Sequence, residues 1–336
     1  MSELVDEKLN EIRVFEAGDK ELSGEDSTII AGILNVTPDS FSDGGRYFNV
    51  SDAVRHAKTM IADGAKIIDV GGESTRPGSE EISEDEETRR VVPVIKAMRD
   101  EGIDALISVD TWRASVARHA IEAGADIVND ITGLLGDDEM APIIKEMNSS
   151  VIAMFNPIIM RPEHEGSRVF RSFGYGNPFT PKEQEEMLGL SIVDAMKAYL
   201  NKSLDCAFKA GIQKTHIMLD PGIGFGLTMR ENLELLHNID VLHKMGYCSF
   251  VGVSRKRFII NMLKNEGFDV ELSTPCGLEE ADLASAFLSA ILSSNGVNVL
   301  RVHEVLPHYK ATMIGNAIKN ASLAKDINFS QYQKKD

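Results

Sequence analysis

The sequence predicts an α/β fold: a single (β/α)₈ TIM barrel with short polar extensions at its N- and C-termini. Short apolar runs typical of buried strands recur along the chain, and amphipathic stretches with helical spacing lie between most of them. Strands that alternate with helices give a parallel sheet with right-handed crossovers, and eight such units over about 250 residues fit a closed barrel. The alternative is an open doubly wound sheet, but no Gly-x-Gly-x-x-Gly turn follows the first strand.

The barrel elements follow one another in a regular order. The expected strands are Ile29–Leu34, Lys66–Val70, Ala105–Val109, Ala125–Val128, Ser150–Phe155, His216–Leu219, Ser249–Val253 and Val297–Val302. The clearest expected helices are Asp52–Asp63, Arg113–Ala123, Glu231–Met245 and Glu280–Ser294. In this fold the active site lies at the carboxyl ends of the strands.

Both ends of the chain read differently from the barrel at residues 28–321. Residues 1–27 are rich in Asp and Glu and only weakly periodic, which indicates a frayed acidic extension outside the barrel. Residues 322–336 form a similar C-terminal tail. Neither end carries recognisable chemistry.

Composition excludes several classes of protein. The formal charge of −17 disfavours a nucleic-acid partner, because phosphate backbones select basic surfaces. No apolar segment is long enough to span a membrane, and the N-terminus lacks the pattern of a secretory signal. Three widely spaced cysteines without a Cys-x-x-Cys pair read as reduced thiols. A cytoplasmic protein is therefore expected.

Two polar loops follow the first two strands. Residues 35–45 are dense in turn-forming residues, yet Phe41 lies in the middle, where a ring is costly unless the loop closes over a ligand. Residues 71–78 have glycine at both flanks and Pro77 near the tip. Together the loops predict a two-part lid that orders when substrate binds.

Acceptor side chains end three later strands. Asp110, Asn129 and Asp220 follow the third, fourth and sixth strands. A carboxylate accepts two parallel N–H bonds and an amide both donates and accepts, so the set suits a flat hydrogen-bonding heterocycle. Met154 and Phe225 are candidates for its apolar walls. Taken singly, Asp110 is equally an N-cap, and both apolar residues are equally core.

Basic residues gather at strand ends in an otherwise acidic chain. Arg76 follows the second strand, residues 254–257 open a helix after the seventh, and Arg301 and His303 share one face of the eighth. Cations at one end of a barrel attract an anionic substrate such as a diphosphate; the alternative is solvated loop charges. No cluster has transition-metal spacing, so any metal is expected to be Mg²⁺, held by oxygen ligands such as Asn35 and the diphosphate.

In sequence order these motifs resemble those of the dihydropteroate synthases. The resemblance covers roughly residues 29–321 and includes the 35–45 and 71–78 loops, residues 108–111, 129–130, 220–226, 254–256 and 301–303. It implies the condensation of 6-hydroxymethyl-7,8-dihydropterin diphosphate with para-aminobenzoate to 7,8-dihydropteroate and diphosphate, by a dissociative displacement. It also implies a homodimer formed through outer helices and inhibition by sulfonamides.

The resemblance assigns roles residue by residue. It implies catalysis by Asp110, Asp220, Lys256, Arg301 and His303, and pterin binding by Asp110, Asn129, Met154, Asp220, Phe225 and Lys256. It implies diphosphate binding by Asn35, Arg76, Arg301 and His303, a Mg²⁺ contact at Asn35, and para-aminobenzoate binding by Phe41, Thr75, Pro77 and Arg257.

Some residues depart from the family pattern, and two rival functions remain at this level. Arg257 stands where many relatives carry Ser. The stretch 156–182 is unusually long and forms either an added lid or pocket wall or a solvated insertion.

One rival function is that of a corrinoid-linked methyltetrahydrofolate methyltransferase, which shares the pterin-binding barrel but needs no diphosphate site. A non-catalytic pterin-binding protein is the other rival, although the loop and diphosphate residues are all present.

Overall fold

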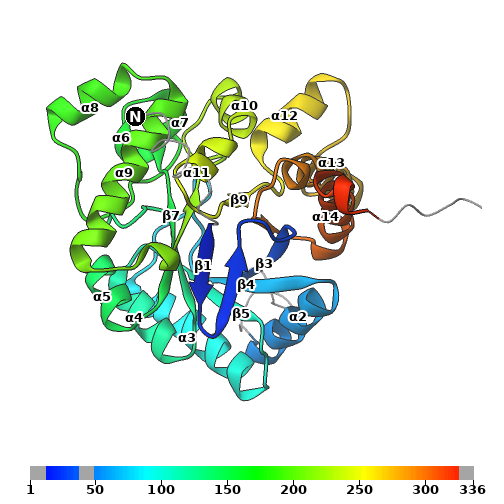
Figure 1. Cartoon of the computed structure of the whole chain (residues 1–336), viewed down its shortest axis with the longest axis horizontal. Helices are drawn as coiled ribbons and strands as arrows, with labels where there is room; N and C mark the ends of the chain where they lie inside the picture. The colour runs from blue at the N-terminus through cyan, green and yellow to red at the C-terminus, as the bar shows by residue number, and fades with distance from the viewer. Residues whose placement is uncertain (1–12, 38–48, 325–336) are drawn as a thin grey trace, which may run out of the picture.

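Eight parallel strands form a ring surrounded by helices in the computed structural model, which describes residues 13–37 and 49–324 (Figure 1). The strands are β3 (Ile29–Asn35), β4 (Ala65–Gly71), β5 (Leu106–Asp110), β6 (Ile127–Asp130), β7 (Ser150–Met154), β8 (Ile217–Asp220), β9 (Phe250–Gly252) and β10 (Val299–Val302). Their order is β8-β7-β6-β5-β4-β3-β10-β9, and a bridge between Leu219 and Ser249 joins β8 to β9. All eight expected strands and the barrel are confirmed.

The helices pack around the outside of the ring. They are α2 (Val50–Ala62), α3 (Glu84–Asp100), α4 (Ala114–Glu122), α5 (Met140–Glu146), α6 (Pro157–Met160), α7 (Glu165–Arg168), α8 (Pro181–Leu188), α9 (Ile192–Ala210), α10 (Met229–His237), α11 (Asp240–Lys244), α12 (Arg257–Asn265), α13 (Pro275–Ser294) and α14 (Val305–Lys319), with 3₁₀ turns η2 (Lys214–His216) and η3 (Ala321–Leu323). Across 13–37 and 49–324, none of them has both the length and the apolar character to cross a bilayer.

The prediction of a single helix over residues 231–245 is wrong in one respect, because the segment forms two helices. α10 ends at His237, and the Asn238 side chain donates to the Glu234 carbonyl oxygen at 2.8 Å. A side chain that satisfies the last turn in this way competes with continuation of the helix. The chain restarts as α11 at Asp240.

The amino-terminal end of the barrel interior is filled by one apolar residue from each strand. These are Ala31, Ile67, Leu106, Ile127, Ile152, Met218, Phe250 and Val299, and all are buried. A barrel of eight strands is just wide enough for side chains to fill. This end is therefore solid, and any ligand must enter at the opposite end.

The prediction of a frayed N-terminal extension is wrong for residues 14–23, which are ordered against the barrel. β1 (Val14–Ala17) and β2 (Lys20–Ser23) form an antiparallel hairpin, and Phe15, 1% exposed, joins the apolar cluster inside the barrel. The Ser150 hydroxyl also donates to the Glu16 carbonyl oxygen at 2.5 Å. The hairpin thus closes the amino-terminal end of the barrel (Figure 1). The acidic composition hid two sequence signals for it, the alternation of Phe15 and Ala17 and the two-residue turn Gly18-Asp19.

Candidate active site

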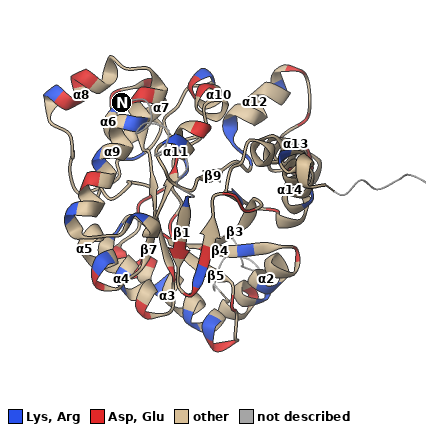
Figure 2. Ribbon diagram, in the orientation of Figure 1, with Lys and Arg blue, Asp and Glu red and all other residues tan. Residues whose placement is uncertain are grey.

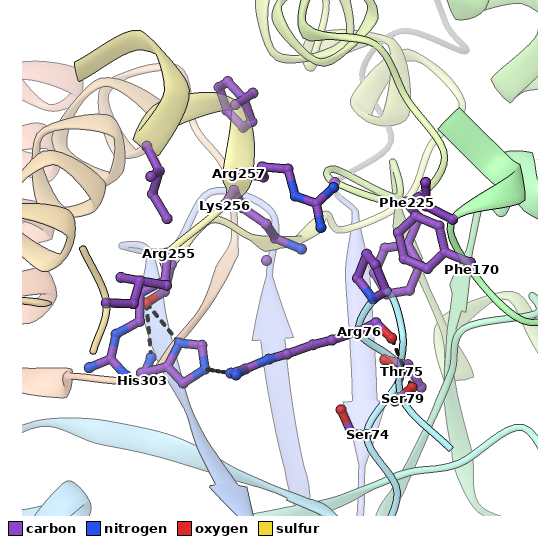
Figure 3. Close-up of a pocket in the computed structure, with 18 of the residues that line it drawn as sticks. Ser74, Thr75, Arg76, Ser79, Phe170, Phe225, Arg255, Lys256, Arg257 and His303 are labelled. Atoms are coloured by element: carbon purple, nitrogen blue, oxygen red, sulfur yellow. Dashed lines mark hydrogen bonds between the residues drawn. The ribbon is translucent and has the colours of Figure 1, made fainter. Parts of the chain in front are cut away.

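The carboxyl ends of the strands open into a cavity of about 1840 Å³ (Figure 3). Ten of the predicted site residues line it: Asn35, Thr75, Arg76, Pro77, Asp110, Phe225, Lys256, Arg257, Arg301 and His303. Asn129, Met154 and Asp220 are buried at the same ends of β6, β7 and β8 without lining the cavity surface. Phe41 lies outside the described residues. The barrel therefore brings together residues that are almost 270 positions apart in the chain.

A buried carboxylate that the sequence analysis missed organises the floor of the site. Arg301 donates from Nε to Asp69 Oδ2 and from Nη2 to Asp110 Oδ2, each at 2.5 Å. Asp69 also accepts from Ser108 Oγ at 2.5 Å and from Asn129 Nδ2 at 3.2 Å. Asp69 lies inside an apolar strand run, so only its barrel-facing position marks it as part of the site. Burial raises the pKa of Asp110 to about 7, although the Arg301 guanidinium opposes that rise.

Asp220 presents one free oxygen. Its Oδ1 accepts from the Gly222 backbone N–H at 2.7 Å, and Oδ2 accepts no hydrogen bond within residues 13–37 and 49–324. Gly222 has φ +72°, and a Cβ there would lie 2.0 Å from the Phe155 carbonyl oxygen, so only glycine fits this turn. Burial raises the pKa of Asp220 to about 6, whereas Lys256 opposes that rise.

Lys256 is the basic counterpart of these acceptors. Its Nζ lies 5.2 Å from the centre of the Phe225 ring, and no ion pair or hydrogen bond involves it in the part of the chain that the structure describes. Burial lowers the pKa of Lys256 to about 8, with Asp220 and Asp110 opposing the change. The side chain passes so close to Gly224 that a Cβ there would lie 2.8 Å from Lys256 Cδ. A half-buried ammonium at the cavity surface is placed to donate to a ligand.

The turn before α12 directs the side chains of Arg255 and Lys256 to different partners. Arg255 has a φ of 56°, unusual for a residue with a side chain, and its guanidinium pairs with the Asp282 carboxylate at 2.7 and 2.8 Å. The ion pair and a hydrogen bond from the Arg255 N–H to Ser285 Oγ stabilise this backbone. Arg255 is thus held by α13, while Lys256 faces the ring of Phe225 (Figure 3).

His303 is a neutral imidazole of defined tautomer. Arg76 Nη2 can only donate, so His303 Nε2 accepts at 3.2 Å, and Nδ1 carries the proton that it donates to Ser254 Oγ at 2.9 Å (Figure 3). Burial and the neighbouring cations, Arg255 foremost, hold the pKa of His303 well below its usual range. Burial and the guanidinium groups of Arg255 and Arg301 also lower the pKa of Arg76. This side of the cavity is strongly electropositive and suits an anion.

Buried ion pairs hold the base of the 71–78 loop. Glu73 pairs with Arg113 at 3.0 Å and with Arg171, and Glu87 pairs with Arg113 as well. Glu73 Oε1 also accepts from the Ile82 backbone N–H at 3.0 Å. The loop that carries Thr75, Arg76 and Pro77 is thereby anchored to α3 and to the start of α4 by buried ion pairs.

The 156–182 stretch is a pocket wall, one of its two expected roles. Val169 and Phe170 line the cavity, and the Phe170 ring stacks on Phe225 with centres 6.0 Å apart and planes at 21° (Figure 3). Arg171 continues from this wall to Glu73, so the wall and the 71–78 loop are tied together.

The site fits a magnesium ion only with help from the substrate. In the described residues, no group of three or more His, Cys, Asp or Glu side chains is arranged to hold a metal. Asn35 Oδ1 and Asp110 Oδ2 both lie beside Gly71, 3.8 and 3.7 Å from the position of a Cβ built there. Mg²⁺ prefers oxygen ligands and is commonly bound through substrate phosphates. These oxygens at an anion-binding mouth fit that mode.

Comparisons with known proteins agree with this geometry. The family described as pterin binding enzyme matches residues 31–303. A dihydropteroate synthase from Streptococcus pyogenes is 40% identical over 281 residues, covering 84% of this chain and 92% of that protein.

Solved structures give the same result. Dihydropteroate synthase from Clostridium difficile, determined in the presence of pteroic acid, is 37% identical, with a TM-score of 0.70 and coverage of 88% of this chain and 97% of that one. Dihydropteroate synthase from Yersinia pestis, in complex with a sulfonamide drug, is 31% identical, with a TM-score of 0.72 and coverage of 92% and 99%.

Proposed function

Because the chain belongs to the dihydropteroate synthases of the pterin-binding enzyme family, we propose that its cavity joins 6-hydroxymethyl-7,8-dihydropterin diphosphate to para-aminobenzoate, releasing diphosphate. One observation carries the assignment of the site. The acceptors Asp110 and Asp220 and the donor Lys256 lie at the same barrel mouth as the cations Arg76 and Arg301. A heterocycle site and an anion site therefore adjoin.

The pterin is bound at the bottom of the cavity, by residues at the carboxyl ends of the strands. The free oxygen of Asp220 and the carboxylate of Asp110 accept N–H groups of the ring, and Lys256 Nζ donates to a ring oxygen or nitrogen. Asn129 adds its amide, and Met154 and Phe225 supply apolar contact. Asn129 and Asp220 are buried and Asp110 and Lys256 are half-buried, so a ligand that leaves one of these polar groups unpaired binds weakly.

The diphosphate lies on the electropositive side. Arg301 Nη1 makes no hydrogen bond within the described residues and can donate to a phosphate oxygen, as can Arg76. A diphosphate beside His303 raises the pKa of the imidazole, because negative charge stabilises the imidazolium, and Nε2 then donates instead of accepting. Mg²⁺, held by Asn35 and the diphosphate, would neutralise charge on the leaving group.

The residues support a dissociative displacement. The bond from the pterin methylene carbon to the diphosphate oxygen breaks first, and the electron pair leaves with the diphosphate. The carboxylates of Asp110 and Asp220 stabilise the cation left on the dihydropterin. The aniline nitrogen of para-aminobenzoate then forms the new C–N bond and loses a proton. No enzyme nucleophile takes part.

The reaction itself is tested by a Mg²⁺-dependent assay of diphosphate release from the pterin diphosphate, with and without para-aminobenzoate. We expect release to be matched by 7,8-dihydropteroate. Pterin binding without product would identify a non-catalytic pterin-binding protein and refute the proposed function.

Pterin binding should depend on pH with an optimum between the pKa values of the acceptors and of Lys256. Asp220 and Asp110 accept fully only above their pKa values of about 6 and about 7, and Lys256 donates as an ammonium only below about 8. Affinity should fall on both sides of this window. Titration of 6-hydroxymethyl-7,8-dihydropterin, which lacks the titrating diphosphate, measures this directly; an affinity that stays constant from pH 5 to about 9 would contradict it.

Para-aminobenzoate should lie between the 71–78 loop and the start of α12. Arg257 is the first residue of α12, so its side chain and the N-terminal N–H groups of the helix can both meet the carboxylate. We expect Arg257→Ser to raise the KM for para-aminobenzoate about 5- to 20-fold with little change in kcat. Inhibition by a sulfonamide, which lacks the carboxylate, should change less.

Lys264→Ser is the matched control for this prediction. Lys264 lies on the same helix and also lines the cavity, but in the last turn of α12. Its removal should leave the KM for para-aminobenzoate unchanged. Equal effects of the two variants would reduce the role of Arg257 to general charge.

We also place a homodimer interface on the outer face of α13 and α14. Six apolar residues there are 47–64% exposed: Leu283, Phe287, Ile291, Met313, Ile314 and Ile318. The two helices pack against each other and are mostly free of charge, whereas most of the other outer helices carry charges of both signs (Figure 2). An apolar surface of this kind is typical of a subunit interface.

The interface proposal makes a prediction about mass. The wild-type chain should have about twice its 36.9 kDa mass by light scattering, and Phe287→Glu should give the single-chain mass, because a charge cannot be buried there unpaired. Phe208→Glu, on the exposed face of α9, should stay dimeric. A monomeric wild type would refute the interface.

The proposed compartment remains the cytoplasm, supported by three cysteines that form no disulfide.

A further inference from the structure

Asp69 lies one layer below the residues assigned to substrate. It pairs with Ser108 in the register of β4 and β5, whereas Asp110 pairs with Asn129 in the next layer toward the mouth. Asp69 is 0% exposed and does not line the cavity. Its carboxylate cannot touch a ligand there, yet it contacts two residues that the site uses, Asn129 and Arg301.

The contact with Asn129 decides which way that amide points. A carboxylate only accepts, so the Asn129 group facing Asp69 at 3.2 and 3.4 Å must be its NH₂. Because Asp69 lies below, the NH₂ points down and Oδ1 points toward the mouth. Asn129 Oδ1 accepts no hydrogen bond within the described ranges, so it is available to a ligand.

The contact with Arg301 fixes a second group. Nε donates to Asp69 and Nη2 to Asp110, which holds the plane of the guanidinium at two points and leaves Nη1 for an anion. Ser108 Oγ completes the set by donating to Asp69 at 2.5 Å. A carboxylate with these donors is locked in one orientation.

We propose that Asp69 is a positioning residue, which turns the Asn129 amide oxygen toward the pterin and holds the Arg301 guanidinium beneath the diphosphate. The inference rests on the proposed function and deepens it. With Asp69 in place, Asp110, Asn129 and Asp220 all present acceptors, and Lys256 is the donor. The site therefore selects a heterocycle edge rich in N–H groups.

Asp69→Asn tests the orientation. Arg301 Nε keeps an oxygen at the Oδ2 position, so the new NH₂ takes the Oδ1 position, where it meets the Ser108 hydroxyl and, at 3.4 Å, the Asn129 NH₂. The hydroxyl can turn to accept, whereas two NH₂ groups repel each other, so we expect the Asn129 amide to turn over and accept from position 69. A donor then meets the donor edge of the pterin. We expect the Kd of 6-hydroxymethyl-7,8-dihydropterin to rise about 10- to 100-fold, while the KM for para-aminobenzoate stays near the wild-type value.

The double variant Asp69→Asn/Asn129→Asp separates orientation from damage. The charge is conserved, the amide introduced at position 69 donates to the carboxylate introduced at position 129, and an oxygen again faces the mouth. Pterin affinity should return to within about threefold of wild type. Asp126→Asn, which weakens a 2.5 Å pair with Arg99 at the opposite end of the barrel, should lower stability without changing the Kd.

The outcomes distinguish this proposal from the proposed function. Wild-type affinity in Asp69→Asn, or a double variant that binds no better than Asp69→Asn, would overturn the positioning role. A wild-type protein that binds the pterin but makes no dihydropteroate would refute the synthase, while the affinities of the variants still decide the role of Asp69. A wild-type protein that binds no pterin would overturn both.

Discussion

Replacing Arg301 with methionine will abolish dihydropteroate formation and destabilise the barrel. Arg301 is the partner of two carboxylates at 2.5 Å each, the fully buried Asp69, and Asp110, which is 12% exposed. Removing one partner of a buried ion pair costs about 3–5 kcal/mol, because the remaining charge stays unpaired. The same change removes the guanidinium donors from the diphosphate side, which we expect to lower kcat/KM by about 1000-fold or more.

Urea unfolding and the diphosphate-release assay measure the two effects separately. Arg301→Lys is the control, because it keeps a positive charge but its compact ammonium lacks the planar fork of donors that spans Asp69, Asp110 and a phosphate. It should recover much of the stability and little of the activity. An Arg301→Met variant with wild-type turnover would remove Arg301 from the site.

Asp220→Asn will weaken pterin binding without harming the fold. The Gly222 N–H holds an oxygen on its own side at 2.7 Å, so the new NH₂ must replace the free oxygen of Asp220. A donor then faces the N–H edge of the pterin, and we expect the Kd for the pterin to rise about 100-fold.

Although its pterin affinity falls, the Asp220→Asn variant should be at least as stable toward unfolding as the wild type at pH 7. Burial raises the pKa of Asp220 to about 6, above its unfolded value of 3.8, so the ionised carboxylate opposes folding at pH 7. Asparagine removes that penalty, and the variant should unfold at an equal or higher temperature at pH 7. The benefit should disappear below about pH 4, where the carboxyl group is protonated in both states. Calorimetry and pterin titration together check this; unchanged affinity would refute the assignment of Asp220.

The sequence indicated the site residues at or near the strand ends but not Asp69, which lies in the middle of a strand. Asp110, Asp220 and Lys256 follow apolar runs, where a polar residue has no role in the core, so the sequence marks them. Asp69 stands inside the run Ile67–Val70 and looks like an interruption of a strand. Its role depends on Arg301, which is 232 residues away.

The wall at Phe170 shows the same limit. Its sequence neighbourhood indicates only a long loop, with either of two roles. The stacking of Phe170 on Phe225 and the pair between Arg171 and Glu73 decide in favour of a wall. Both contacts join segments that follow different strands and are distant in the chain.

By itself, the sequence determined the eight strands, the barrel and the polar residues at the mouth, because hydrophobic periodicity and loop composition are local properties. It did not determine the packing of the hairpin against the amino-terminal end of the barrel, the orientation of Asn129 or the ion pairs of Arg301. Those depend on which groups meet across the ring, and a hydrogen bond between residues distant in the chain leaves no local pattern. Only the tertiary structure decided them.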